Sequence, residues 1–253
     1  MAFTDILLFE MVCLVMATVL IGYVGIVGYF AMRANNAKGL KETFRGAAVP
    51  LGSLGFTATT LGIWGEMVWP LPGSYNILFT DVFLLFGVTL LVLAVSMALS
   101  LKLQYAGLFG LVSGGMAIAY GYNGWQLGMT KEPFDTFLLF AGFGFAGILG
   151  FPATVVADRY LAHPDGSAFS FGSSLSVTRR HPSIQAATQA AQPIVPGGNE
   201  SGSETESAGA SRFHLPVYIS ATMIIFVVFI ALAGIAALYF VDSTLPAHLA
   251  SAP

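Results

Sequence analysis

The stretch GEMVWPLPGSYNILFTD, from Gly65 to Asp81, separates two long apolar runs. It carries an acid near each end, two prolines and a glycine, and it contains no Lys or Arg. Proline removes a backbone donor and biases the residue before it away from helix, so Pro70 and Pro72 indicate a helix end. Gly73 and Ser74 suit the turn that follows. The stretch therefore predicts a turn between two helices.

The composition of the chain predicts that its solvent is largely lipid. Of the 253 residues, 56% are hydrophobic and 9% are charged, whereas soluble domains carry about 25% charged residues. The net charge of −3 gives no reason to expect a nucleic-acid partner. Cys13 is the only cysteine, so it cannot form a disulfide within the chain. We therefore expect a membrane protein whose first partner is the lipid bilayer.

Six segments have the roughly 20 mostly apolar residues that a spanning helix needs. They are Ile6–Met32, Val49–Trp69, Val82–Leu101, Tyr105–Leu127, Phe134–Val156 and Pro216–Val241. An isolated strand in hydrocarbon would leave its backbone polar groups unpaired, so the spans are expected to be helices. The predicted fold is all-α, a polytopic transmembrane bundle of six spanning helices.

The basic residues predict the orientation of these spans. Every Lys and Arg except Lys131 falls on one side of the predicted topology: Arg33, Lys38, Lys41, Arg45, Lys102, Arg159, Arg179, Arg180 and Arg212. Cytoplasmic loops carry an excess of Lys and Arg. Both termini are therefore expected outside, and WPLPGSYN becomes an outer turn. The first apolar run lacks a basic leader and is read as a retained helix. We expect a multi-pass protein of the cell (plasma) membrane.

Composition also divides the chain. Residues 1–160 form a predicted five-helix transmembrane block, 161–214 a cytoplasmic loop, 215–242 the sixth helix and 243–253 a short outer tail. From about 168 to 211 the loop is rich in small and polar residues. Such a segment cannot bury enough apolar surface to offset its ordering entropy, so it is expected to be disordered. An inert linker is the favoured interpretation, and a partner-binding segment is the alternative.

The 29 glycines predict close helix packing. GFGFAG, from Gly142 to Gly147, fits the nucleotide-binding pattern G-x-G-x-x-G, but that reading requires a preceding strand, and here the motif lies inside a predicted span. In lipid, small residues allow helix backbones to approach closely. Such faces could meet within the chain, in self-association or against other membrane subunits, and the sequence leaves these alternatives open.

Ionisable groups inside a membrane are costly, and they suggest a functional site. Glu10 and Glu66 lie in the outer parts of the first two spans, where two carboxyls at similar depth could share a proton. Two simpler interpretations remain open. Asp81 could cap the third span, and Glu66 could pair with Lys131. The candidate binding residues of an outer-side polar pocket are Glu10, Glu66, Tyr75, Asn76, Asp81, Asn123 and Lys131.

No catalytic or metal-binding motif appears in the sequence. The four histidines, His163, His181, His214 and His248, lie outside the apolar cores, so a haem held by two histidines on facing helices is not expected. The chain has no H-E-x-x-H, C-x-x-C or P-loop pattern. We therefore predict no catalytic residue, no metal and no cofactor, and the chain is expected not to be an enzyme.

Two segments carry a resemblance to a known family. WPLPGSYNILFTD and the later LGMTKEPFDTFLLFAGFGFAGILGFPAT resemble DUF981, a family of uncharacterised multi-pass membrane proteins of archaea and some bacteria. The matching residues are Trp69, Pro70, Leu71, Pro72, Gly73, Ser74, Tyr75, Asn76, Phe79, Asp81, Thr130, Lys131, Pro133 and Pro152. Thr80 stands where the family usually has glycine. The resemblance covers about residues 51–154 and implies a multi-pass membrane protein without implying a reaction.

Three functional hypotheses follow. The leading one is a non-catalytic or accessory subunit of a membrane complex, because the chain combines glycine-rich faces with few intramembrane charges. The second is a small proton- or cation-coupled carrier that uses Glu10 and Glu66, although carriers usually show internal repeats. The third is a membrane enzyme or quinone-site protein whose outer pocket holds a lipid-soluble substrate.

Overall fold

The computed structural model describes residues 6–71, 73–163 and 217–251, and within these ranges the chain is helical and has no strand. The elements are α1 (Ile6–Arg33), α2 (Ala37–Val68), α3 (Ser74–Asn76), η1 (Ile77–Asp81), α4 (Val82–Ala98), α5 (Gln104–Gln126), α6 (Pro133–Ala162) and α7 (Val217–Ser251). The predicted all-α class is confirmed. The predicted disordered segment from 168 to 211 lies outside the described residues.

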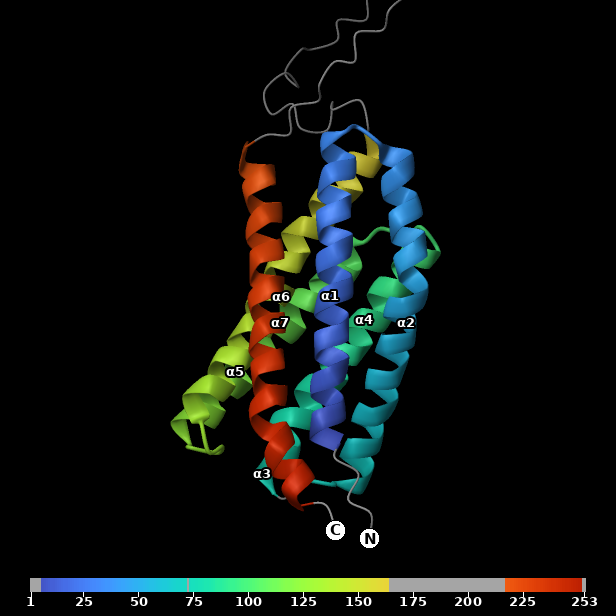
Figure 1. Ribbon diagram of the computed structural model, residues 1–253. Helices are drawn as coiled ribbons and strands as arrows, with labels where there is room; N and C mark the ends of the chain where they lie inside the picture. The colour runs from blue at the N-terminus through green and yellow to red at the C-terminus, as the bar shows by residue number, and fades with distance from the viewer. Residues whose placement is uncertain (1–5, 72, 164–216, 252–253) are drawn as a thin grey trace, which may run out of the picture.

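The long helices form one bundle in which successive helices alternate in direction (Figure 1). The helices α1, α2 and α7 run along its length, and α5 and α6 cross behind them obliquely. The start of α1 and the end of α7 lie at the same end of the bundle, whereas Arg33 and Arg159, near the ends of α1 and α6, belong to the opposite end.

Five helical segments are long and apolar enough to cross a membrane: Ile6–Arg33, Ala37–Val68, Ser74–Ala98, Pro133–Ala162 and Ser220–Tyr239. The sixth expected span, α5, is not among them. It contains no Asp, Glu, Lys or Arg, so charge is not the cause. Its glycines and polar residues lower its mean hydropathy instead. The structure thus supports five spans by length and composition.

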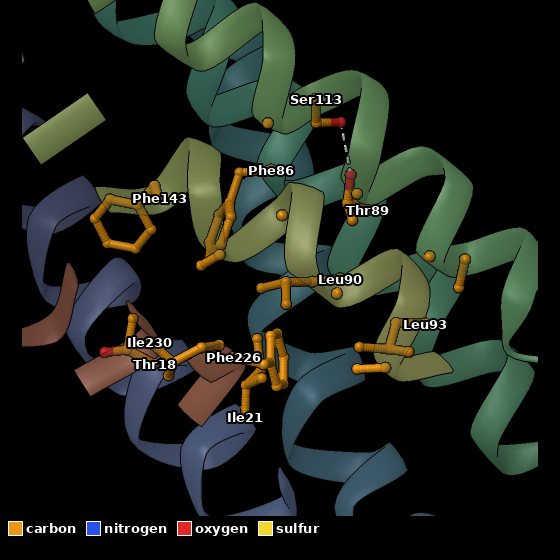
Figure 2. Close-up of a pocket in the computed structure, with 18 of the residues that line it drawn as sticks. Thr18, Ile21, Phe86, Thr89, Leu90, Leu93, Ser113, Phe143, Phe226 and Ile230 are labelled. Carbon is orange, nitrogen blue, oxygen red and sulfur yellow. Dashed lines mark hydrogen bonds between the residues drawn. The ribbon is translucent and has the colours of Figure 1, made fainter. Parts of the chain in front are cut away.

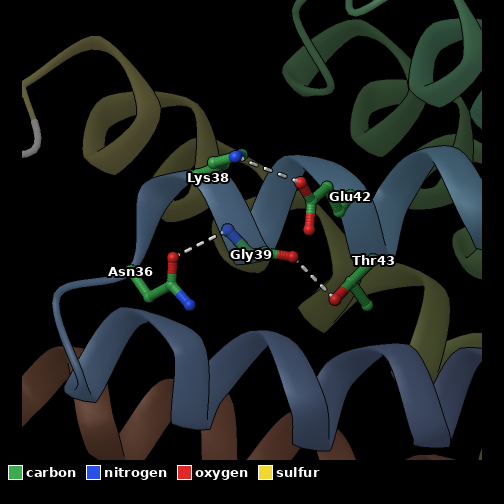
Figure 3. Close-up of polar contacts among 5 residues, drawn as sticks. All are labelled: Asn36, Lys38, Gly39, Glu42 and Thr43. Carbon is green, nitrogen blue, oxygen red and sulfur yellow. Dashed lines mark hydrogen bonds and ion pairs between the residues drawn. The ribbon is translucent and has the colours of Figure 1, made fainter.

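The second helix begins earlier than the sequence predicts. It starts at Ala37, not near Val49, because the Asn36 side chain accepts a hydrogen bond from the Gly39 amide at 2.8 Å (Figure 3). This N-cap satisfies one of the free amides of the first turn. Beside it, Lys38 and Glu42 form an ion pair at 4.0 Å, but both side chains are exposed, so the pair adds little stability.

The second helix ends at the turn as the sequence predicts, but the start of the next helix and the end of α7 differ from expectation. Trp69 ends α2 in a left-handed conformation (φ 52°), and helix resumes at Ser74, well before Val82. A π-helical turn, η1, leads directly into α4. At the other end of the chain, α7 continues to Ser251, so most of the expected tail 243–253 is helical. Alanine and leucine residues in that segment favour helix.

Glycines bring two pairs of helices into backbone contact, as the sequence predicts. A Cβ at Gly55 of α2 would lie 2.6 Å from the Leu91 amide nitrogen of α4, and one at Gly87 of α4 would lie 2.5 Å from the Thr59 nitrogen of α2. Between α5 and α6, a Cβ at Gly147 would lie 2.5 Å from the Gly110 carbonyl oxygen. The GFGFAG segment is therefore a packing surface used within the chain.

Adjacent glycines on α5 test this packing. Gly114 faces the backbone of α6, whereas an added Cβ at Gly115 meets nothing within 4 Å. We expect Gly114→Ala to lower the free energy of unfolding by about 1–3 kcal/mol because it overpacks the interface. Gly115→Ala is expected to be neutral or to stabilise by up to about 1 kcal/mol, since glycine disfavours helix. Thermal unfolding in detergent measures both, and equal effects would contradict the assigned contact.

Candidate functional site

A cavity of about 220 Å³ lies inside the bundle, between α1, α4, α5, α6 and α7 (Figure 2). Along α1 its lining extends from Glu10 to Met32, a separation of about 33 Å at 1.5 Å per residue. Most of its walls are aliphatic and aromatic, with Phe86 and Phe143 packed edge to face. The cavity is therefore long, narrow and apolar.

The hydroxyl groups in the cavity wall are already hydrogen-bonded. Thr89 donates to the Leu85 carbonyl at 2.8 Å, and its hydroxyl lies 2.9 Å from that of Ser113 on α5 (Figure 2). Thr18 donates to Val15 at 2.7 Å, and Thr154 makes the same kind of bond at 2.8 Å. Cavities with apolar walls stay dry and bind apolar molecules. These hydroxyls therefore leave the apolar character of the cavity intact.

Glu10 is the exception in this lining. Its side chain is only 1% exposed, and its Oε1 atom has no hydrogen-bond partner in the described structure. No Lys, Arg or His of the described residues forms an ion pair with it. Its polar neighbour is the buried thiol of Cys13, one turn along α1. A buried carboxyl without a partner costs free energy, which marks Glu10 as a functional candidate.

A second polar group lies at the end of the bundle where α2, η1 and α5 meet. Tyr120 of α5 donates a hydrogen bond to Asp81 Oδ2 at 2.8 Å. The Glu66 carboxyl lies close enough to Asp81 to interact with it, while its own Oε1 has no hydrogen-bond partner. We call Glu66, Asp81 and Tyr120 the Glu66–Asp81–Tyr120 cluster. Asp81 does not cap α4 with its side chain, because η1 continues the helix through this position.

Asn76 connects this cluster to the turn WPLPG. It is fully buried, its Oδ1 accepts from the Leu71 amide at 3.3 Å, and its Nδ2 donates to the Gly65 carbonyl at 3.2 Å. The same Gly65 carbonyl accepts from the Trp69 amide, which ends α2. Asn76 therefore joins both sides of the turn. Its two hydrogen bonds satisfy the polar atoms of a fully buried side chain.

The structure brings together only part of the predicted pocket. Glu66, Asn76 and Asp81 gather at one end of the bundle, but the carboxyl beside Glu66 belongs to Asp81. Glu10 instead lines the cavity. The remaining predicted residues, Tyr75, Asn123 and Lys131, are exposed. Tyr75 stacks on Phe79, Asn123 donates to a backbone carbonyl of its own helix, and no ion pair joins Lys131 to Glu66 within the described ranges.

Sequence reasoning missed the cavity and three polar contacts. Tyr120 was not among the candidates although it bonds Asp81. The pairing of Thr89 and Ser113 on neighbouring helices was not foreseen. Asp158 of α6 accepts from the backbone amides of residues 103 and 104, which caps the start of α5. The sequence shows hydroxyl groups inside apolar spans and an acid near the end of a helix. These residues indicate that polar contacts form, but their positions in the sequence do not indicate which groups they contact.

In the part of the chain that the structure describes, an all-helical bundle with five helices long and apolar enough to cross a membrane defines an integral, multi-pass membrane protein. Within the described residues, no group of three His, Cys, Asp or Glu side chains is arranged to hold a metal ion. The chain belongs to the family described as protein of unknown function DUF981, whose model matches residues 1–164. The match covers α1 to α6 and ends before α7. No curated protein and no solved structure matches the chain.

The role of Asn76 is testable against an exposed asparagine. Asn76→Ala removes the acceptor of the Leu71 amide and leaves that amide unpaired, so we expect a loss of about 1–3 kcal/mol in the free energy of unfolding. Asn123→Ala removes a bond on an exposed helix face and is expected to change stability by less than about 0.5 kcal/mol. Unfolding in detergent compares the two variants, and a loss at Asn123 as large as that at Asn76 would refute the assignment.

Proposed function

We propose that this integral membrane protein binds a lipid-soluble molecule in its central cavity and acts without catalysing a reaction. The observation that carries the proposal is the cavity itself, with a volume of about 220 Å³ and walls that are almost wholly apolar. An apolar cavity of about 150 Å³ in a protein core is enough to bind benzene. A long space of this size suits an extended hydrocarbon better than a polar solute.

The surroundings of the cavity support binding over chemistry. The lining contains no Lys, Arg or His, and its hydroxyl groups are engaged by other protein atoms. Glu10 is therefore the single ionisable group facing the cavity. General acid–base catalysis commonly needs a group within hydrogen-bonding reach of each proton that moves. A single isolated carboxyl is therefore easier to explain as part of a binding site than as part of an enzyme's active site.

The accessory-subunit hypothesis is compatible with such a binding role. The glycine surfaces offered for self-association are largely occupied within the chain: Gly22 and Gly25 face α7, and Gly55 faces α4. Contact with other subunits would therefore use apolar side chains such as Phe56 or Leu108, which are exposed on the surface of the bundle. A carrier that uses Glu10 and Glu66 remains the alternative, although the carboxyl beside Glu66 belongs to Asp81.

We also propose that the chain spans the cell membrane six times and that both termini lie on the outer side. The case for α5 as the sixth span rests on three features. It has no charged side chain, its 23 residues extend about 34 Å, and its glycines pack against α6, which is itself apolar enough to span. The basic residues near the α1–α2 turn favour a cytoplasmic position for that turn.

A cavity-filling variant tests ligand binding. Ala117 of α5 is buried and lines the cavity, whereas Ala119 on the same helix is exposed and does not. Membranes containing each variant are photolysed with a long-chain alkane that carries a diazirine, and the adducts are mapped by mass spectrometry. Ala117→Leu is expected to reduce adducts on the cavity lining at least threefold, because leucine occupies the space, while Ala119→Leu leaves them unchanged.

The contrary outcome for this experiment is also defined. Adducts found only on residues that face the bilayer, in equal yield for both variants, would reject a ligand-binding cavity. Size-exclusion chromatography of each variant confirms that the bundle remains folded, so a reduced yield in Ala117→Leu reports occupancy of the cavity.

Cysteine labelling tests the six-span topology. In a Cys13→Ala background, single cysteines replace Leu101 and Glu132, which are exposed on either side of α5. If α5 crosses the bilayer, a membrane-impermeant maleimide added to intact cells labels position 132 but labels position 101 only after lysis. Labelling of both positions in intact cells would reject α5 as a span.

A further inference from the structure

We propose that Glu10 recognises the neutral hydroxyl headgroup of a single-chain lipid-like alcohol whose tail occupies the cavity. This inference rests on the proposed ligand-binding function and adds the chemical class of the ligand. Glu10 is part of the cavity lining, is 1% exposed and has an unpartnered Oε1 atom in the described structure. A ligand donor that reaches Oε1 would supply the missing hydrogen bond.

Among the described residues, no hydrogen bond to Oε1 and no ion pair explains a carboxyl at position 10. The cavity lining that includes Glu10 is otherwise largely apolar, with Met11, Phe79 and Phe83 among its side chains, and the polar neighbour of Glu10 is the buried thiol of Cys13. A leucine at position 10 would pack there without the cost of desolvating a carboxyl. In contrast, the acids of the Glu66–Asp81–Tyr120 cluster are partly exposed and interact with one another. Within the described ranges, Glu10 is thus a fully buried acid that lines the cavity and lacks a hydrogen-bond partner at Oε1, which a ligand donor would supply.

The lining restricts the headgroup that can fit. No Lys, Arg or His lines the cavity, so a phosphate or carboxylate head would meet Glu10 without a compensating cation. An ammonium head brings three N–H donors and a second buried charge. The next hydroxyl along α1, that of Thr18, lies about 12 Å away along the axis and donates to Val15. A hydroxyl head has one donor, which Oε1 alone can satisfy.

The shape of the cavity restricts the tail. About 220 Å³ spread over much of the length of α1 leaves a narrow space, which suits one extended chain and not the paired chains of a phospholipid. Glu10 lies near the first turn of α1, at the outer end of the predicted topology, while Met32 marks the far end of the lining. The head is therefore placed at the outer end of the cavity and the tail extends along it.

Competition between matched probes tests the proposal. The full-length protein in detergent is photolysed with the diazirine alkane in the presence of dodecane, dodecanol or dodecylamine. In the wild type, dodecanol is expected to compete about tenfold better than dodecane, the effect of one hydrogen bond to a buried carboxyl. In Glu10→Leu the two should compete equally. Glu10→Gln should retain the preference, because its amide oxygen still accepts, and exposed Glu132→Gln serves as the control.

Each outcome has a defined meaning. Equal competition by dodecane and dodecanol in the wild type overturns recognition by Glu10 but leaves a ligand-binding cavity intact. Stronger competition by dodecylamine overturns the neutral headgroup. If the diazirine alkane gives no adducts in the cavity at all, the proposed function fails as well. The wild-type comparison needs no variant, so it decides the proposal even if Glu10→Leu does not fold.

Discussion

Backbone contact at glycine is the interaction on which this bundle depends. In lipid there is no hydrophobic force between helices, so association comes from close packing and from polar contacts. Gly55 and Gly87 allow α2 and α4 to touch backbone to backbone, and Gly110 and Gly147 do the same for α5 and α6. The two helix pairs are thereby held tightly, and the bulkier side chains between them determine how much space remains.

That remaining space is the central cavity. Phenylalanine and leucine side chains from α4 and α6 line it, and the bundle is closed on the other side by α1 and α7. Interiors of proteins are usually packed to crystal-like density, so an apolar space of about 220 Å³ costs van der Waals contacts unless a ligand restores them. Glu10 adds an unmet hydrogen bond to the same space. One molecule with a hydrocarbon tail and a hydrogen-bond donor at its head would restore the van der Waals contacts and supply the hydrogen bond that Glu10 lacks.

Polar contacts outside the cavity stabilise the connections between helices. Asp158 caps α5 from the neighbouring helix, Asn76 joins the two sides of the WPLPG turn, and Tyr120 holds Asp81. The bonds of Asp158 and Asn76 lie at helix ends, where backbone amides and carbonyls lack intrahelical partners. The Tyr120–Asp81 bond instead joins two side chains between α5 and η1. The prolines of WPLPG end a helix and need no functional explanation. Of the two acids in the stretch from Gly65 to Asp81, Glu66 is the one whose role is unexplained, because its Oε1 has no hydrogen-bond partner in the described structure.

The sequence by itself determined that this is a helical membrane protein, because apolar runs of spanning length with few charges permit little else. It also determined where α2 ends, through Pro70 and Pro72, and that the glycines are packing surfaces. Only the tertiary structure decided which groups meet. Glu10 and Glu66 are at similar predicted depth, yet one lines the cavity and the other lies beside Asp81. The rotation of each helix about its axis decides this, and mostly apolar helices with glycines on several faces do not reveal that rotation in their sequence.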